Sequence, residues 1–281
     1  MITFAPGGNS VSFGNRKFPE ELPDYLSSFG LNGYEVECGR GVRINDKTYE
    51  LLPKLAADSG IYLTLHTPYY ISLSSEKEET RLKSVDYILE SAAAAHRLGI
   101  RKIVVHSGSC AKMTREAALA LASDTLVRAQ KALDEAGLTE INICPETMGK
   151  INQLGTLSEV IELCGTDERF IPCVDFGHLN ARSLGGIKTG GDYAAILDEI
   201  ENKLGHDRLK HFHVHFSKIM YTAGGEKMHL TFEDTEYGPQ YEPLMEQFAK
   251  RGLEPSVVCE SDGTQAEDAS EMKRYYEGIK V

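Results

Sequence analysis

The stretch IRKIVVHSGS, residues 100–109, shows the pattern that decides the fold, a short β-rich run that ends on a histidine. Within it, Lys102–His106 has the length and composition of a buried strand. Seven similar runs occur along the chain, at Ile2–Gly7, Tyr34–Cys38, Tyr62–His66, Ile141–Glu146, Pro172–Asp175, His211–Phe216 and Pro255–Glu260. Segments with helical periodicity separate the runs, most clearly Glu78–Leu98 and Thr114–Ala136, each followed at once by a glycine.

The alternation of strand and helix, eight times over, predicts an α/β protein, a (β/α)8 TIM barrel. A doubly wound open sheet is the competing architecture, but no G-x-G-x-x-G motif follows an early strand. No linker or low-complexity tract interrupts the pattern. We therefore expect residues 1–281 to form a single TIM-barrel domain.

Composition limits the function classes. The chain has 281 residues, 41% hydrophobic and 26% charged, and no apolar run approaches the length of a membrane span. Its first ten residues, MITFAPGGNS, lack a signal pattern, so we expect a cytoplasmic protein without membrane contact. The net charge of −12 argues against nucleic-acid binding, although bound divalent cations would present local positive charge. Six cysteines without a CxxC pair predict reduced core thiols.

Most of the runs end with a side chain that can bind a metal ion, and a barrel brings all its strand ends together. The residues concerned are His66, His106, Glu146, Asp175, His213 or His215, and Glu260. Buried carboxylates are costly unless they are paired or coordinated, so the last four strand ends predict one metal site. His66 and His106 would complete a second site, with Glu146 as the bridging ligand. Two metals so placed could clamp a phosphate for in-line attack.

Four histidines leave open how the ligands are divided. His213 and His215 are two residues apart, so a strand places both on one face, and either or both could be ligands. His178 follows Asp175 in the sequence Asp-Phe-Gly-His, where Gly177 is expected to allow a tight turn. His178 and His229 could form a further nitrogen-rich site.

Six segments in order resemble the endonuclease IV family of apurinic/apyrimidinic endonucleases (family 2), within the xylose-isomerase-like TIM barrel superfamily. They are LTLHTPYYISLSS (63–75), VVHSGS (104–109), CPETMG (144–149), VDFGHLNAR (174–182), HVHFSK (213–218) and VVCESDG (257–263). The resemblance implies a zinc-dependent endonuclease that cleaves DNA on the 5′ side of abasic sites in base excision repair. Imidazole and carboxylate ligands also suit manganese or iron. The sequence predicts no particular oligomeric state.

The resemblance implies a centre of two or three zinc ions. The first ion would be held by His66, His106 and Glu146, the second by Glu146, Asp175, His213 and Glu260, and the third by His178 and His229. The family has Asp-x-His at the third site, whereas this chain has Lys227-Met228-His229, so Glu226 or His215 could supply the missing ligand. Glu146 and Glu260 are the expected catalytic residues.

The resemblance also suggests DNA contacts. Tyr69 and Tyr70 match the loop that enters DNA in the family, although two tyrosines after a strand could equally pack the barrel rim. Lys218 is expected to meet phosphate, as Arg182 and Arg43 could. The loop after the second strand, CGRGVRIND, matches the family poorly.

Two alternatives stay open. A sugar isomerase or epimerase of the same superfamily would need only one metal, held by the residues that end strands five to eight, and would act on a small sugar. Such an enzyme does not need the additional histidines, which therefore favour the nuclease. A descendant that binds without turnover is the other alternative.

Overall fold

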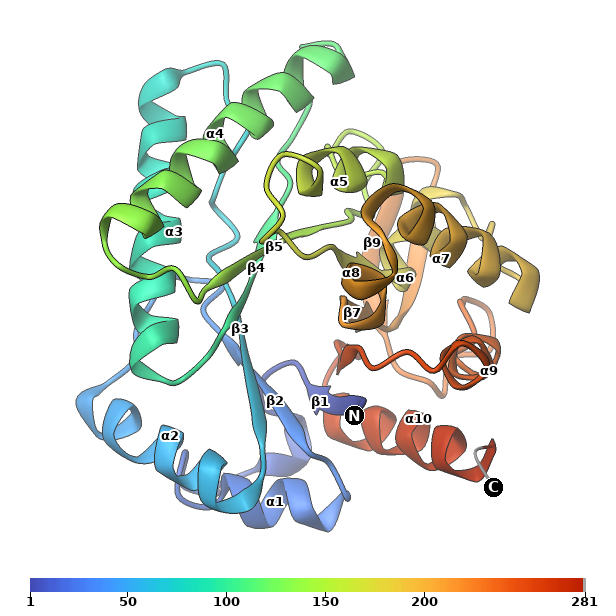
Figure 1. The fold of residues 1–281 in the computed structure, drawn as a ribbon. Helices are drawn as coiled ribbons and strands as arrows, with labels where there is room; N and C mark the ends of the chain where they lie inside the picture. Colours follow the sequence, from blue (N-terminus) through green and yellow to red (C-terminus); the bar gives the residue numbers. More distant parts are fainter. Residues whose placement is uncertain (280–281) are drawn as a thin grey trace.

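A computed structural model of the chain describes residues 1–279. Eight parallel strands form a nearly closed barrel in the order β1-β10-β7-β6-β5-β4-β3-β2 (Figure 1). Their bounds are β1 Thr3–Pro6, β2 Gly33–Glu37, β3 Tyr62–His66, β4 Lys102–His106, β5 Asn142–Glu146, β6 Cys173–Asp175, β7 His213–Phe216 and β10 Ser256–Cys259. The barrel closes between β1 and β2, where Gly7 bridges Glu35 and the amide of Gly8 donates to the carbonyl of Glu35 at 3.0 Å.

Helices cover the outside of the barrel. They are α1 Leu22–Ser28, α2 Asp46–Ser59, α3 Glu78–Arg97, α4 Arg115–Glu135, α5 Leu157–Cys164, α6 Phe176–Arg182, α7 Gly190–Leu204, α8 His206–Lys210, α9 Glu242–Arg251 and α10 Gln265–Ile279, with a 3-10 turn at Val11–Phe13. The two longest, α3 and α4, pack against each other (Figure 1). The side chain of Thr114 caps the start of α4, and Gly99 follows α3 in a left-handed conformation at φ 70°.

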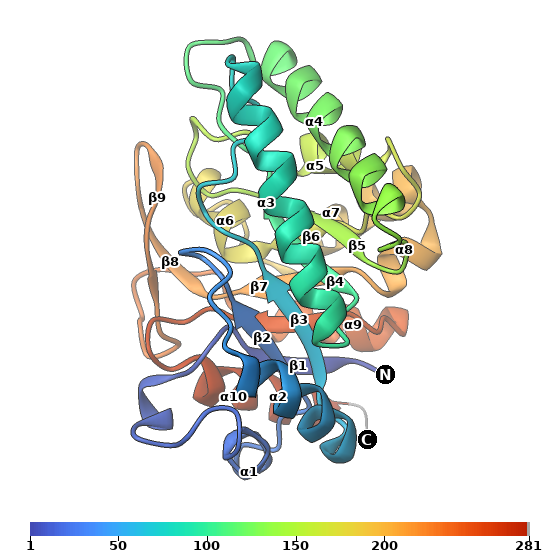
Figure 2. The same cartoon turned by 90° about the vertical axis from the view of Figure 1, so that its left-hand side faces the viewer.

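The structure confirms the predicted TIM barrel, and each predicted run overlaps one barrel strand. One local prediction was wrong. Gly177 lies inside α6 and makes no tight turn; a Cβ there would come within 2.5 Å of the Ser217 carbonyl oxygen, so a close approach requires the glycine. The segment after β7 is mostly a hairpin, β8 Lys218–Thr222 and β9 Gly225–Leu230, which projects from the barrel (Figure 2).

Apolar side chains fill the space between the strands and the helices, and the largest fully buried ones include Phe4, Phe170 and Phe212. All six cysteines lie in the described part of the chain, where each is buried and free of any disulfide, as the sequence predicted. Among residues 1–279, no helix combines the length and hydropathy that a membrane span requires.

Candidate metal centre

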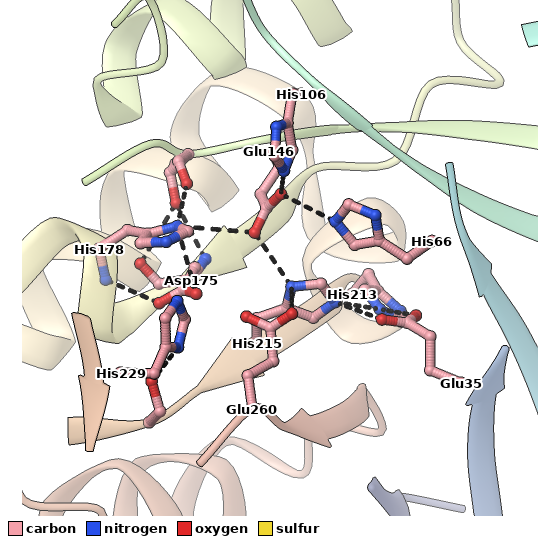
Figure 3. Close-up of polar contacts among 12 residues, drawn as sticks. Glu35, His66, His106, Glu146, Asp175, His178, His213, His215, His229 and Glu260 are labelled. Carbon is pink, nitrogen blue, oxygen red and sulfur yellow. Dashed lines mark hydrogen bonds and ion pairs between the residues drawn. The ribbon is translucent and has the colours of Figure 1, made fainter. Parts of the chain in front are cut away.

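Nine ligand-type side chains meet at the carboxyl ends of the barrel strands (Figure 3). They form three groups, and within each group the candidate ligand atoms lie within 4.8 Å of one another. The groups are His66, His106 and Glu146; Glu146, Asp175, His215 and Glu260; and His178, Glu226 and His229. Because the first two groups share Glu146, the side chains surround one continuous space.

Glu146, at the end of β5, is the centre of this arrangement and is 1% exposed. Its Oε2 faces the Nε2 atoms of His106 and His66, at 3.3 and 3.6 Å. Its Oε1 lies 3.0 Å from Nδ1 of His215 and 3.6 Å from Nδ1 of His178. One carboxylate therefore reaches histidines from four different elements, as a bridging ligand would.

The structure corrects the predicted ligand on β7. His215 lies beside Glu146 and also 3.4 Å from Glu260, whereas His213 faces Glu35 in the barrel interior. The register explains the difference, because His215 pairs with Asp175 at the end of β6 and His213 pairs with Cys173, two residues deeper. His215 therefore takes the place that the sequence analysis gave to His213.

The third group contains an acid that replaces the expected aspartate. Nε2 of His178 lies 3.5 Å from the Glu226 carboxylate, and the His178 and His229 rings are 5.5 Å apart. Lys227 is exposed. Of the two alternatives considered for the missing ligand, the structure brings Glu226 to this group and His215 to the second.

The side chains present fit divalent cations in three respects. Two atoms each about 2.0–2.1 Å from a tetrahedral zinc ion lie roughly 3.3 Å apart, close to the contacts of Glu146. Glu146 Oε2 and Asp175 Oδ2 are buried and accept no hydrogen bond. The Nδ1 atoms of His66 and His178 lie 2.8 and 2.9 Å from the carbonyl oxygens of Thr67 and Thr147. Each Nε2 is thereby left free toward the centre, as in a metal-bound histidine.

The electrostatics also call for added positive charge. Burial disfavours the ionised carboxylate of Glu146, but the surrounding histidines outweigh burial and hold its pKa well below the usual range. Burial similarly lowers the pKa of histidine, yet nearby carboxylates raise that of His66 to about 10 and that of His178 to about 9. Burial dominates at Asp175 and raises its pKa to about 7. Either protons or bound cations can balance these acids, and the orphaned oxygens favour cations.

A pocket of about 560 Å³ opens onto this centre. Its lining includes Glu37, Arg40, Arg43, Tyr69 and Gln265 beside the ligand-type residues His229 and Glu260. Sequence reasoning missed the acids of β2, Glu35 and Glu37. Two acids at alternate positions in an otherwise apolar run, YEVEC, were the available signal.

The predicted DNA contacts divide into exposed and internal side chains. Tyr69 and Tyr70 are 56% and 49% exposed, and the Tyr69 ring stacks on His106 at 5.3 Å. Lys218 is only 5% exposed, and its ammonium group donates to the carbonyls of Phe232 and Asp234. The ammonium group of Lys218 therefore lies inside the hairpin region, and its expected phosphate contact stays a prediction.

Arg182 has a similar internal role. Its guanidinium group donates to four carbonyls of the segment that follows β5, those of Met148, Lys150, Ile151 and Gln153. Arg43, by contrast, is exposed and lines the pocket. Of these two arginines, only Arg43 is placed to meet a ligand.

Comparison with known proteins agrees with the fold. A family model described as a xylose isomerase-like TIM barrel matches residues 23–280. An uncharacterized protein of Methanocaldococcus jannaschii is 30% identical over 99% of this chain and 98% of its own length. A probable endonuclease 4 of Shouchella clausii is 26% identical over 75% of this chain and 74% of its own length.

Two solved structures share the fold. A D-tagatose 3-epimerase-like protein has a TM-score of 0.74 at 17% identity, covering 99% of this chain and 98% of its own. Endonuclease IV from Thermus thermophilus has a TM-score of 0.68 at 18% identity, covering 98% of each chain. Both classes of enzyme considered from the sequence are thus found among proteins of this fold.

Proposed function

The chain belongs to the xylose isomerase-like TIM barrel family, and from that premise we propose that it is a divalent-metal-dependent phosphodiesterase that cleaves DNA 5′ to abasic sites. The observation that carries this proposal is the set of three ligand groups around one space, two of them joined through Glu146. A single-metal isomerase needs only the second group. The first and third groups add two histidines each. These four histidines would serve as ligands in a centre of two or three ions.

The three groups would hold zinc, or manganese or iron, which suit the same ligands. Bound there, the cations would act as Lewis acids on a phosphate ester and lower the pKa of a water molecule. Glu146 would hold two ions at a fixed separation, because its two oxygens face different groups. Glu260, beside the pocket and 16% exposed, would accept a proton from the attacking water.

The pocket residues would position the substrate. Tyr69 covers His66 and His106, with ring distances of 5.1 and 5.3 Å, and so shields this side of the centre from water. Its hydroxyl group donates to Glu37 at 3.4 Å, which helps hold the ring in place. Arg40 and Arg43 would contribute the positive charge that a phosphate backbone requires, since the chain as a whole is acidic.

A sugar epimerase is the second candidate, and a specific observation favours it. The second group alone, Glu146, Asp175, His215 and Glu260, is the metal set expected of such an enzyme, with carboxylates placed to move a proton. Glu37 adds a further acid to the pocket, which would suit sugar hydroxyls better than phosphates. The two candidates differ in the number of ions and in the need for His106.

The test is incision of a duplex that carries one abasic site, with and without a chelator, alongside epimerisation of a panel of ketoses. We expect metal-dependent incision by the wild type, its loss in His106→Ala, and unchanged incision by Glu162→Gln, which alters an exposed side chain on α5. Ketose turnover retained by His106→Ala, without incision by the wild type, would replace the first candidate with the second. No turnover in either assay would refute both.

A further inference from the structure

Deeper in the barrel than the second ligand group, one carboxylate lies against two histidines (Figure 3). Glu35 on β2 is fully buried, and its Oε1 lies 2.8 Å from Nε2 of His215. Its Oε2 lies 3.0 Å from Nε2 of His213 and accepts a hydrogen bond from the Thr64 hydroxyl at 2.7 Å. Since β2 and β7 are not neighbours in the sheet, these contacts cross the barrel interior.

A carboxylate in this position is costly unless its charge is used. Each of its oxygens faces one imidazole nitrogen, Nε2 of His215 at 2.8 Å and Nε2 of His213 at 3.0 Å, and these two nitrogens lie 3.2 Å from each other.

The contact has a direct consequence for His215. A neutral imidazole has a proton on only one ring nitrogen, and the hydrogen bond at that nitrogen decides which one is free to bind a metal. A proton on Nε2, the nitrogen beside Glu35, would leave Nδ1 free, and Nδ1 lies 3.0 Å from Glu146 and 3.4 Å from Glu260. The lone pair is then directed into the metal group.

We propose that Glu35 is a positioning residue that fixes the tautomer and orientation of His215, so that Nδ1 is presented to the metal in the second group. His213 and Thr64 hold the other carboxylate oxygen and prevent the carboxylate from rotating away. This role gives His213, which lies outside the second group, a function in the barrel interior. The inference rests on the proposed metal centre but not on the identity of the substrate.

The test compares the wild type with Glu35→Gln, which keeps the size of the side chain but only one acceptor. Metal affinity is measured with Zn²⁺ and Co²⁺ against a chromophoric chelator, and the histidine tautomers by long-range ¹H–¹⁵N NMR. We expect a 10- to 100-fold weaker affinity for one ion. In the zinc-loaded wild type His215 should carry its proton on Nε2, and this preference should be lost in the variant.

Two further variants keep the test decisive. Thr64→Val removes only the hydroxyl that holds Glu35, should fold, and should weaken the same ion a few-fold. Gln130→Met replaces a buried polar side chain on α4 in the helical layer and should leave affinity unchanged. Wild-type affinity and an unchanged His215 tautomer in both the Glu35 and Thr64 variants would overturn this inference alone. A wild type that binds no metal would overturn the proposed centre as well.

Discussion

The loop that supports the third ligand group depends on one ion pair, and this pair makes a testable link between pH and stability. Glu159, at the start of α5, is 10% exposed and faces Arg115 at the start of α4. Nε and Nη2 of Arg115 each donate to one carboxylate oxygen at 2.7 Å. Arg115 also donates to the carbonyls of Ile151 and Gln153, so the pair anchors the segment after β5.

The magnitude follows from the pKa of Glu159. Burial raises it, but the hydrogen bonds from Arg115 and from the amides of Thr156 and Gly155 outweigh burial and lower the pKa from 4.5 to about 2. A difference of about 2.5 units between the pKa values of the unfolded and folded states corresponds to about 3 kcal/mol of folding stability. Because Arg115 is partly exposed, solvent screens the ion pair, and we expect its net contribution to the free energy of unfolding to be about 2 kcal/mol.

The sign of the pH dependence is fixed. The folded state has the lower pKa, so the stabilisation is complete above about pH 4.5 and is lost as the pH falls toward 2. Glu159→Gln should therefore lower the free energy of unfolding by about 2 kcal/mol at pH 7, and this difference from wild type should shrink steadily below pH 4.5.

The assay is urea unfolding of both proteins at pH 7, 5, 4 and 3, read from far-ultraviolet circular dichroism. Comparing variant with wild type at each pH cancels the other acids that titrate in this range. Glu162→Gln, an exposed substitution on the same helix, should show no such difference. A variant as stable as wild type at pH 7, or a difference that does not change down to pH 3, would refute the reasoning.

Three further outcomes are expected. Lys218→Met should destabilise the protein by about 1–3 kcal/mol, because two partly buried carbonyls lose the donor that Lys218 provides, and thermal unfolding checks this; weaker DNA binding at unchanged stability would contradict it. Glu226→Gln should remove one ion and leave those of the other groups, as measured by elemental analysis, so full metal content would exclude the third group. Tyr69→Ala should raise KM several-fold at unchanged metal content, because the ring packs on His66 and His106; an unchanged KM in steady-state kinetics would count against this role.

The barrel could be predicted because most strand runs combine β-branched residues with a ligand-type residue at or near their end. The run Lys102–His106, for example, was predicted with its correct bounds. The ligand on β7 could not be predicted in the same way. His213 and His215 share a face, and only the register with Asp175 shows which of them reaches the end of the barrel.

Acids in the middle of a strand were harder to predict than acids at the end of a strand. Glu35 lies in the middle of its strand and binds side chains from across the barrel, a long-range contact that no local pattern encodes. The internal position of the Lys218 ammonium group could not be predicted for a related reason. A lysine just after a strand is usually solvated, but here the chain turns into a hairpin and later carbonyls enclose its ammonium group.

The β8–β9 hairpin pairs with itself and touches the segment after β5 through the bridge between Lys150 and Gly225, without joining the eight-stranded sheet. Yet it carries Glu226 and His229, two of the three residues of the third ligand group. The barrel could therefore gain or lose this group through one insertion, with its eight strands and the Glu146 groups intact. The number of metal ions that such a barrel could hold would then depend on the length of a single loop.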